Sequence, residues 1–364
     1  MRSIYLAAVL TGVATTMLGP LMPGFEARWN LDDGQGGLFF TAQFIAQVST
    51  AAFVGVLAKR LGYWRLIACG LAGAALGVAG CASGSWTIAM LSVAVYGCGF
   101  GVVIPAANLA AAASVAGDSA RPVLWLNLCW SVGAVTAPAL VAGLRSAFLP
   151  SLAIGLLAMA VLVGLRTAGA LPPARIPKSP AGKLPHAAFA LLLFLYVGSE
   201  SSIAGWVSSY ATRSAGTQEL WAVLPSVFWG AILVGRLVAP GVLRRVDAES
   251  LAPWSLAAAL AGAALLIAGG GPGAMLAGSA LSGLGFAPIF PLVVAVYADR
   301  TGGGSLSGLV FCAAGLGGAA IPPLVGLLSN ATGSLRMALA AVLALIVAMI
   351  GLTRTAMPQS GRSA

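Results

Sequence analysis

The sequence predicts an all-α polytopic membrane protein in which twelve transmembrane helices form two six-helix bundles. Three observations support this prediction: a scarcity of charge, a series of apolar runs and an internal repeat. Only 8% of the 364 residues are charged and 59% are hydrophobic, whereas a soluble domain contains about 25% charged residues. Each apolar run is about 20 residues long, which is the length a helix needs to cross about 30 Å of hydrocarbon.

Small residues dominate many of these runs. The 48 glycines would weaken helices in water, but in lipid small residues let helices approach one another closely. The five cysteines lie inside apolar runs, without metal-ligand spacing or a disulfide pattern, and are expected to be small packing residues. The first apolar run continues to about Phe25 and many others follow it, so it is predicted to be a span and not a cleaved signal peptide.

The predicted spans alternate with loops that are mostly short, so consecutive helices are expected to be antiparallel neighbours. In chain order they are residues 4–25, 38–58, 66–83, 86–115, 123–144, 148–166, 187–211, 220–243, 252–270, 272–298, 308–329 and 335–353. The one long connector, 167–186, is rich in proline and basic residues and has no apolar periodicity. It divides the chain into an N-terminal bundle of residues 1–166 and a C-terminal bundle of residues 187–364.

Lysine and arginine are unevenly distributed between the two sides of the membrane. Fourteen lie on the side that has the connector and both ends of the chain, and four lie on the other: Arg28, Arg145, Arg213 and Arg336. Cytoplasmic loops contain an excess of Lys and Arg. Both termini and the connector are therefore expected to be cytoplasmic, in a cell inner membrane. The net charge of +10 is explained by topology, and no nucleic-acid partner is expected.

The two halves contain an internal repeat. A shift of 186 residues places Gly12 on Gly198 and Gly97, Gly99, Phe100 and Pro105 on Gly283, Gly285, Phe286 and Pro291, and a shift of 184 places Gly133 on Gly317. Six spans in each half give both halves the same orientation. They are therefore expected to be related by a pseudo-two-fold axis along the membrane normal, with a solute site near the midplane between them.

The loop at residues 55–65, GVLAKRLGYWR, resembles a signature of the major facilitator superfamily, Gly-x-x-x-Asp-Arg-x-Gly-Arg-Arg. The matching residues are Gly55, Arg60, Gly62 and Arg65. Lys59 stands where the family has the aspartate that helps to latch one state, so the usual latch is in doubt here. The resemblance implies the family's fold and makes Arg60 a candidate gating residue or charge partner.

Within the superfamily, four segments resemble the fucose/glucose-type sugar:proton symporters. They are residues 97–108, 196–206, 228–236 and 285–291. The resemblance implies transport of a sugar together with a proton. Some members of that group use acidic residues in the first and fourth spans, and neither span has one here, so that coupling scheme does not transfer to this chain.

Glu200 is the one acidic residue of nine that lies deep inside a predicted span. It follows Ala187 by thirteen residues, which places it about 20 Å into the helix, near the midplane. The 186-residue shift places it on Ala14, so the fold does not require an acid there. We expect Glu200 to be the proton-coupling site, because an intramembrane acid marks function by default. The alternative is a protonated or paired glutamate that holds spans together.

Arg236 is the second ionisable residue inside a span, and it is predicted to be a charge partner of Glu200 or a gating residue. Snorkelling of its side chain to the interface is the alternative. Polar and aromatic residues in other spans are candidates for solute binding: Gln43, Gln47, Asn108, Asn127, Trp130, Ser199, Ser202, Trp206 and Trp229. Sugars need hydrogen-bonding groups and flat rings, but each of these side chains would equally serve in packing or in hydrogen bonds between helices.

These observations predict a secondary active carrier working by alternating access, in the first place a proton-coupled symporter of a monosaccharide or similar small polar solute. No nucleotide-binding, hydrolytic or metal-ligating pattern is found, so neither an enzyme nor a cofactor is expected. Sodium is a weaker alternative to the proton, and a monomer in the lipid bilayer is expected. A proton-driven efflux carrier for drugs or other amphipathic molecules is the alternative function. A sensor or a lipid flippase on the same scaffold is a third.

Overall fold

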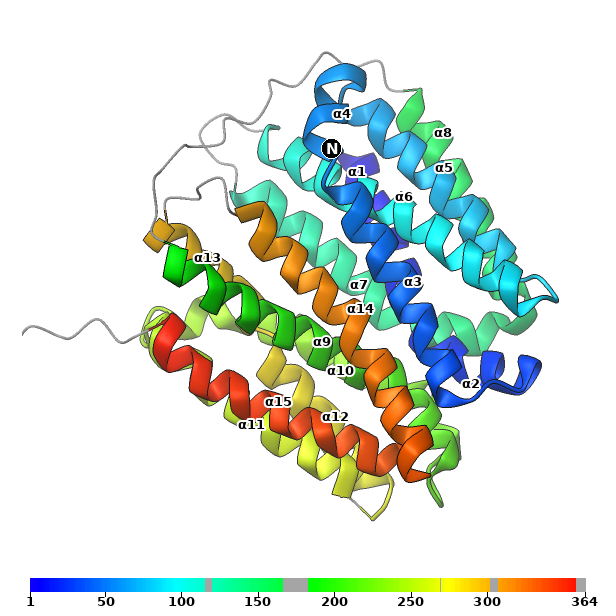
Figure 1. Ribbon diagram of the computed structural model, residues 1–364. Helices are drawn as coiled ribbons and strands as arrows, with labels where there is room; N and C mark the ends of the chain where they lie inside the picture. The colour runs from blue at the N-terminus through cyan, green and yellow to red at the C-terminus, as the bar shows by residue number, and fades with distance from the viewer. Residues whose placement is uncertain (115–119, 166–182, 269, 302–306, 358–364) are drawn as a thin grey trace, which may run out of the picture. The chain divides into compact units, whose positions relative to one another are not determined.

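The computed structural model describes residues 1–114, 120–165, 183–268, 270–301 and 307–357, and all secondary structure in these residues is helical (Figure 1). The chain forms two compact units. The first comprises Met1–Leu31 and Leu38–Arg175, and the second comprises Asp32–Gly37 and Ile176–Ala364. The division falls inside the predicted connector 167–186, most of which lies outside the described residues. Its last four residues are not connector but the beginning of a helix.

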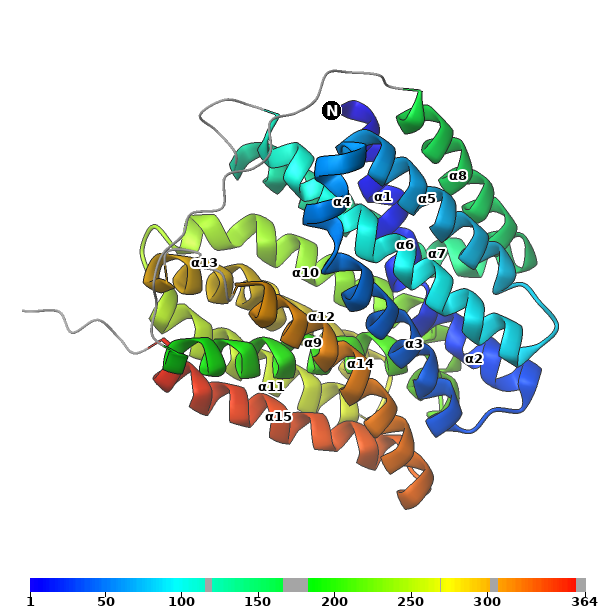
Figure 2. The same cartoon turned by 45° about the horizontal axis from the view of Figure 1, so that its top comes forward.

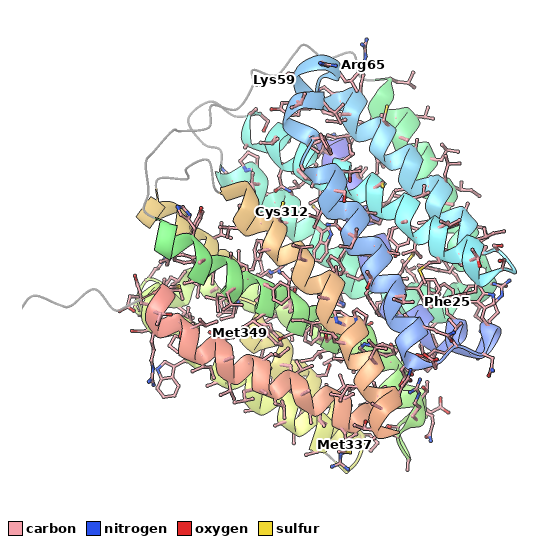
Figure 3. The ribbon with its side chains drawn as sticks, in the orientation of Figure 1. Phe25, Lys59, Arg65, Cys312, Met337 and Met349 are labelled. Carbon is pink, nitrogen blue, oxygen red and sulfur yellow. The ribbon has the colours of Figure 1, made fainter. Side chains whose placement is uncertain are left out.

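The first unit is built from eight helices and one 3-10 turn. They are α1 (Arg2–Thr16), α2 (Leu18–Trp29), α3 (Asp33–Ala51, whose first turn belongs to the second unit), α4 (Val54–Leu61), α5 (Tyr63–Gly80), α6 (Trp86–Ala112), α7 (Ala120–Leu144), η1 (Arg145–Ala147) and α8 (Phe148–Gly164). The N-terminus lies at the same end of this unit as the α4–α5 turn, where Lys59 and Arg65 are neighbours (Figures 1 and 3). This agrees with the predicted clustering of basic residues on one side.

The second unit contains the remaining helices. They are α9 (Lys183–Arg213), η2 (Gln218–Leu220), α10 (Val223–Val242), α11 (Ala248–Ala268), α12 (Pro272–Phe286), α13 (Ile289–Thr301), α14 (Ser307–Thr332) and α15 (Leu335–Ala356). The helix α15 runs alongside α11, and both views show this pair (Figure 2). The longest helix of the unit, α9, packs against α14, α15 and α10.

Apolar helices of membrane-crossing length account for the predicted spans. Within the described residues, ten stretches are long and apolar enough, and the pair α3 and α4, bent by 55°, makes an eleventh. One of the ten is a 44-residue stretch, Arg121–Gly164, that comprises both α7 and α8. The prediction of a twelve-span, all-α membrane protein is therefore confirmed, and the chain is a multi-pass membrane protein.

The repeat predicted from glycines reappears as matching close contacts inside each unit. A methyl group added at Gly133 of α7 would collide with the carbonyl oxygen of Val9 in α1. In the second unit, a methyl group at Gly317 of α14 would collide with the carbonyl oxygen of Phe194 in α9. Helices in lipid gain little from apolar contact with one another, so such backbone approach is a main source of their association.

We expect Gly133→Ala and Gly317→Ala each to destabilise the protein by about 1–3 kcal/mol, because the added methyl group overpacks a backbone contact. The apparent melting temperature of the purified protein in detergent measures the effect. Gly143→Ala is the matched control, since a methyl group there meets nothing within 4 Å. Equal melting temperatures for all three variants and the wild type would contradict this account of the packing.

Candidate functional site

Glu200 lies in the middle of α9 and is half-buried. Tyr196 precedes it by one helical turn, so both side chains project from the same face. The hydroxyl group of Tyr196 donates a hydrogen bond to Oε1 of Glu200 over 2.7 Å. The tyrosine itself is 1% exposed, so it is a fixed donor aimed at the carboxylate.

Arg236 of α10 is the charged neighbour of this pair. Its guanidinium group acts electrostatically on both Glu200 and Tyr196, and its side chain is half-buried. An ionised carboxylate at membrane depth is costly unless it has a partner of opposite charge or a hydrogen-bond donor. Glu200 has both, so the second unit contains a half-buried acid whose ionised form has a hydrogen-bond donor and a neighbouring positive charge.

The three candidate solute-binding residues of α9 are buried in helix packing. Ser199, Ser202 and Trp206 are all fully buried. The indole Nε1 of Trp206 donates to the carbonyl oxygen of Pro322 in α14 over 2.9 Å, and Ser202 donates to the carbonyl oxygen of Gly198. The structure therefore favours the packing interpretation for Ser202 and Trp206 over solute binding. The buried hydroxyl group of Ser199 has no hydrogen-bond partner among the described residues.

Gln43 likewise serves in contacts between helices. It is 3% exposed, accepts a hydrogen bond from the Tyr96 hydroxyl group over 2.8 Å and donates one to the carbonyl oxygen of Thr15 over 3.3 Å. These bonds join α3 to α6 and α1, which is the alternative that the sequence left open. Gln47, one turn further along α3, is only half-buried.

Asn108 of α6 and Asn127 of α7 are brought together in the first unit. The Asn127 side-chain amide is 3.5 Å from Oδ1 of Asn108, and each asparagine also donates to a carbonyl oxygen of its own helix. Trp130 is half-buried one turn beyond Asn127. In the second unit, Trp229 of α10 is 8% exposed and packs edge-on against Phe228. Arg60 is exposed in the last turn of α4.

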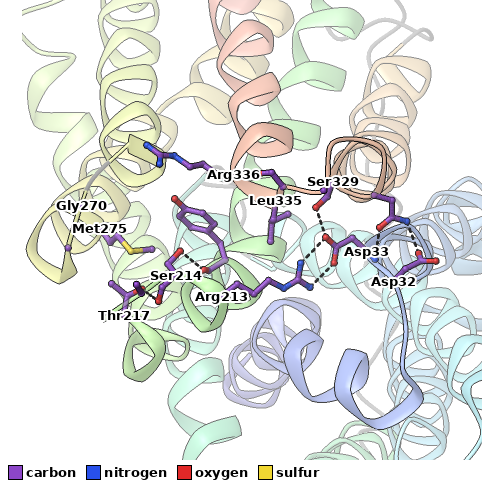
Figure 4. Close-up of a pocket in the computed structure, with 16 residues that line it drawn as sticks. Asp32, Asp33, Arg213, Ser214, Thr217, Gly270, Met275, Ser329, Leu335 and Arg336 are labelled. Carbon is purple, nitrogen blue, oxygen red and sulfur yellow. Dashed lines mark hydrogen bonds and ion pairs between the residues drawn. The ribbon is translucent and has the colours of Figure 1, made fainter.

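An ion pair at the start of α3 was not predicted from the sequence. The guanidinium group of Arg213, at the end of α9, donates two hydrogen bonds to the carboxylate of Asp33 over 2.6 and 2.8 Å (Figure 4). The Asp33 side chain is 8% exposed and that of Arg213 is 41% exposed. The hydroxyl group of Ser329 in α14 donates to the same carboxylate. Asp33 precedes the predicted span 38–58, and no local signal in the sequence pairs it with a residue 180 positions away.

Asn330 and Asp32 extend this network. The backbone N–H group of Asp33 donates to Oδ1 of Asn330 over 3.1 Å, and Nδ2 of Asn330 donates to Asp32 over 2.8 Å. Asp32 also exchanges hydrogen bonds with Gln35 as a capping box. The Gln35 backbone N–H group and the Asn330 amide lower the pKa of the Asp32 carboxyl group below its ordinary value. The three-residue spacing of Asp32 and Gln35 that a capping box requires is present in the sequence.

A cavity of ≈ 690 Å³ adjoins the network within the second unit. Its lining includes the Asp33–Arg213 pair and Arg336 at the start of α15 (Figure 4). The cavity is far from Glu200 along α9, because Arg213 is the last residue of that helix. No group of three or more His, Cys, Asp or Glu side chains that could hold a metal ion occurs among the residues searched, which are those with a described position.

Comparisons with known proteins identify the family. The Major Facilitator Superfamily profile matches residues 4–322. The E. coli fucose:proton symporter is similar at a TM-score of 0.67 and 18% identity over 98% of each chain. A bacterial homologue of the human lysosomal transporter Spinster reaches 0.81 at 13% identity, over 98% of this chain and 95% of that chain. A nucleoside transporter reaches 0.80 at 14%, over 98% and 99%. No curated protein matches.

We expect Asp33→Asn to destabilise the protein by about 1–3 kcal/mol, because it leaves the Arg213 guanidinium group without its bidentate acceptor. Melting temperatures of Asp33→Asn, Arg213→Gln and the double variant measure the coupling, and the single effects should not add. Glu219→Gln, at an exposed acid in η2, is the control and should melt like the wild type. Additive effects of the two single changes would contradict a direct interaction.

Proposed function

The chain belongs to the major facilitator superfamily, and on that premise we propose that it is a proton-coupled symporter of a monosaccharide or a similar small polar solute. Family and fold make it a multi-pass membrane transporter of small-molecule solutes. The proposal adds the class of solute, the coupling ion and the residue that binds the proton. Its main support is the arrangement of Glu200 with Tyr196 and Arg236 in the second unit.

Glu200 suits a proton-binding role for a physical reason. When it is ionised, Tyr196 donates to one of its oxygens and Arg236 balances its charge. When a proton adds to the carboxylate, the charge is lost and the attraction to Arg236 disappears. The two protonation states therefore differ in their interactions with α10, and only such a difference allows a bound proton to shift a conformational equilibrium.

Coupling requires that the carrier change state only with both ligands bound or both absent. In the proposed cycle, the proton on Glu200 removes the Glu200–Arg236 attraction and solute binding then favours closure. After the carrier reopens to the other side, the solute leaves and Glu200 loses its proton to water. The Glu200–Arg236 attraction returns in the empty carrier, which resets the cycle and limits a proton leak.

The solute would be bound by polar and aromatic side chains of the first unit that are not fully buried. These are Gln47, Asn108, Asn127 and Trp130. Amides match sugar hydroxyls, and an indole ring matches the C–H face of a sugar. Two of the similar structures are those of transporters of fucose and of nucleosides, and both solutes contain a sugar ring, which supports this choice.

We further propose an inner-membrane location with both termini in the cytoplasm, a monomer as the working unit and no cofactor. The excess of Lys and Arg on one side supports the orientation. A proton is preferred to sodium because Glu200 is a single carboxylate with few neighbouring oxygen ligands, whereas a sodium site needs several.

We expect purified wild-type protein in liposomes to accumulate a labelled monosaccharide when an inward proton gradient is imposed. Glu200→Gln should lose this accumulation by at least about tenfold, because an amide cannot exchange a proton, while solute exchange across the membrane persists. The measurement is uptake of a panel of monosaccharides with and without the gradient. Glu219→Gln, which removes an exposed acid outside the spans, is the matched control and should behave like the wild type.

The other outcomes separate the alternatives. Accumulation that survives in Glu200→Gln would leave a carrier but remove Glu200 as the coupling site. An absence of sugar movement in every protein would contradict the sugar proposal. Gradient-driven extrusion of a lipophilic cation from the same liposomes would then support the efflux alternative.

A further inference from the structure

The span formed by α12 and α13 is interrupted at Ala287 and Pro288. The interruption has a simple cause in the sequence. Pro288 and Pro291 have no N–H group, so the carbonyl oxygens four residues earlier, those of Leu284 and Ala287, lose their helical donors. Regular hydrogen bonds resume on both sides, from Ala287 to Gly283 and from Leu292 to Pro288. Because two backbone hydrogen bonds are missing, the span bends more easily at this break than elsewhere.

The ring of Tyr196 lies against both sides of the break. Its centroid is 5.8 Å from that of Phe286, the last residue of α12, and 6.1 Å from that of Phe290, the second residue of α13. Because Tyr196 is 1% exposed, its ring has little room to move independently of these two neighbours. The side chain that donates to Glu200 thus also spans the break.

The two segments on either side of the break share α11 as a neighbour but differ in their other attachments. A methyl group at Gly283 of α12 would collide with the Phe228 carbonyl oxygen in α10, and one at Gly285 would collide with α11. The far end of α13 is instead held to α9, where Nδ1 of His186 is 2.8 Å from the hydroxyl oxygen of Tyr297. Relative movement of α9 against α10 would therefore be taken up at the break.

The helix that carries Arg236 also touches the break. Gly235, its immediate neighbour, packs so closely on Ala287 that an added methyl group would overlap the alanine side chain. Both partners of Glu200 are consequently connected to the same point, Tyr196 through its ring and Arg236 through the backbone next to it.

We propose that Tyr196 is a positioning residue that links the protonation state of Glu200 to the conformation of the α12–α13 break. This proposal is built on the proposed role of Glu200. With Glu200 ionised, the Tyr196 hydroxyl group makes a charge-assisted hydrogen bond, which is about twice as strong as a neutral one. A proton from water that adds to the carboxylate removes this assistance. The Tyr196 ring is then free to shift with α13 relative to α12, and no covalent bond of the tyrosine changes.

Few other charged or titratable groups act in this region. The helices α12 and α14 have no charged residue, and α10 contributes only Arg236. Other ionisable residues of the elements around α9, by their positions in the sequence, are Glu219, Tyr297, Asp299, Arg300, Cys312, Arg336 and Arg354. His186 of α9, which contacts Tyr297, is a further titratable group at the far end of α13. The Glu200→Gln and Tyr196→Phe variants keep this contact, so they separate a pH response of Glu200, Tyr196 and Arg236 from one of His186.

Hydrogen–deuterium exchange of the full-length protein tests the link without requiring transport. The readout is protection of the backbone amides of Phe286, Ala287, Ile289 and Phe290 at acidic and alkaline pH, corrected for the intrinsic exchange rate. Protection in the wild type should fall about tenfold on acidification. In Glu200→Gln, which imitates the protonated acid, it should stay low at both pH values.

Tyr196→Phe keeps the ring against Phe286 and Phe290 but removes the donor, so protection at the break should become independent of pH. Tyr210→Phe is the matched control. Its hydroxyl group, on the same helix, donates to the Ile267 carbonyl oxygen, and the variant should respond to pH like the wild type. A Tyr196→Phe variant with the wild-type pH response would overturn the proposal.

Uptake assays on the same variants separate this inference from the proposed function. Removing a donor to the ionised acid should move half-maximal uptake in Tyr196→Phe to higher pH by about 1 unit. Phe290→Leu, which keeps the hydrogen bond but loosens the ring contact, should lower protection at both pH values and leave the midpoint unchanged. If protection follows Glu200 and Tyr196 as expected but uptake does not require Glu200, the link stands and the coupling role fails.

Discussion

Close approach of helix backbones is the constraint on which the rest of this structure depends. Lipid tails are as apolar as the helix surfaces, so burial of apolar side chains contributes little to helix association in the membrane. Small residues instead bring backbones into contact, as Gly133 does with Val9 and Gly317 with Phe194. The two contacts occupy equivalent positions of the repeat, which indicates that both units are assembled by the same packing rule.

A second consequence of the lipid environment concerns polar side chains. Hydrocarbon offers no water, so a polar group inside a span must find a partner in the protein or line a hydrated space. Gln43, Trp206 and Tyr210 all satisfy this requirement through bonds to other helices. Glu200 differs from them, because its partners interact more strongly with its ionised form than with its neutral form and because the side chain is only half-buried.

The spans, the repeat and the position of Glu200 inside a span could be predicted from the sequence. Each of them depends on local composition or on a fixed offset along the chain. The sequence also suggested Arg236 as a charge partner. The sequence could not predict the direction in which side chains point. Ser202 and Trp206 are four residues apart, a spacing that suits either a solute cavity or a packed interface. The Asp33–Arg213 pair could not be predicted from the sequence, because the two residues come together only in the folded structure. Charged residues at the ends of spans are also common in any membrane protein, so their presence alone does not indicate a pair.

The first turn of α3 also has a consequence for how the protein is made. Residues 32–37 are grouped by contacts with the second unit, although α3 continues into the first. During synthesis the ribosome delivers Arg213 and Ser329 long after Asp33, so this turn is without its partners while the first helices enter the bilayer. A fragment ending at the connector would consequently contain every span of the first half but lack the side chains that bind the Asp33 carboxylate. The polar contacts of Asp33 are therefore completed only after α9 and α14 have been synthesised.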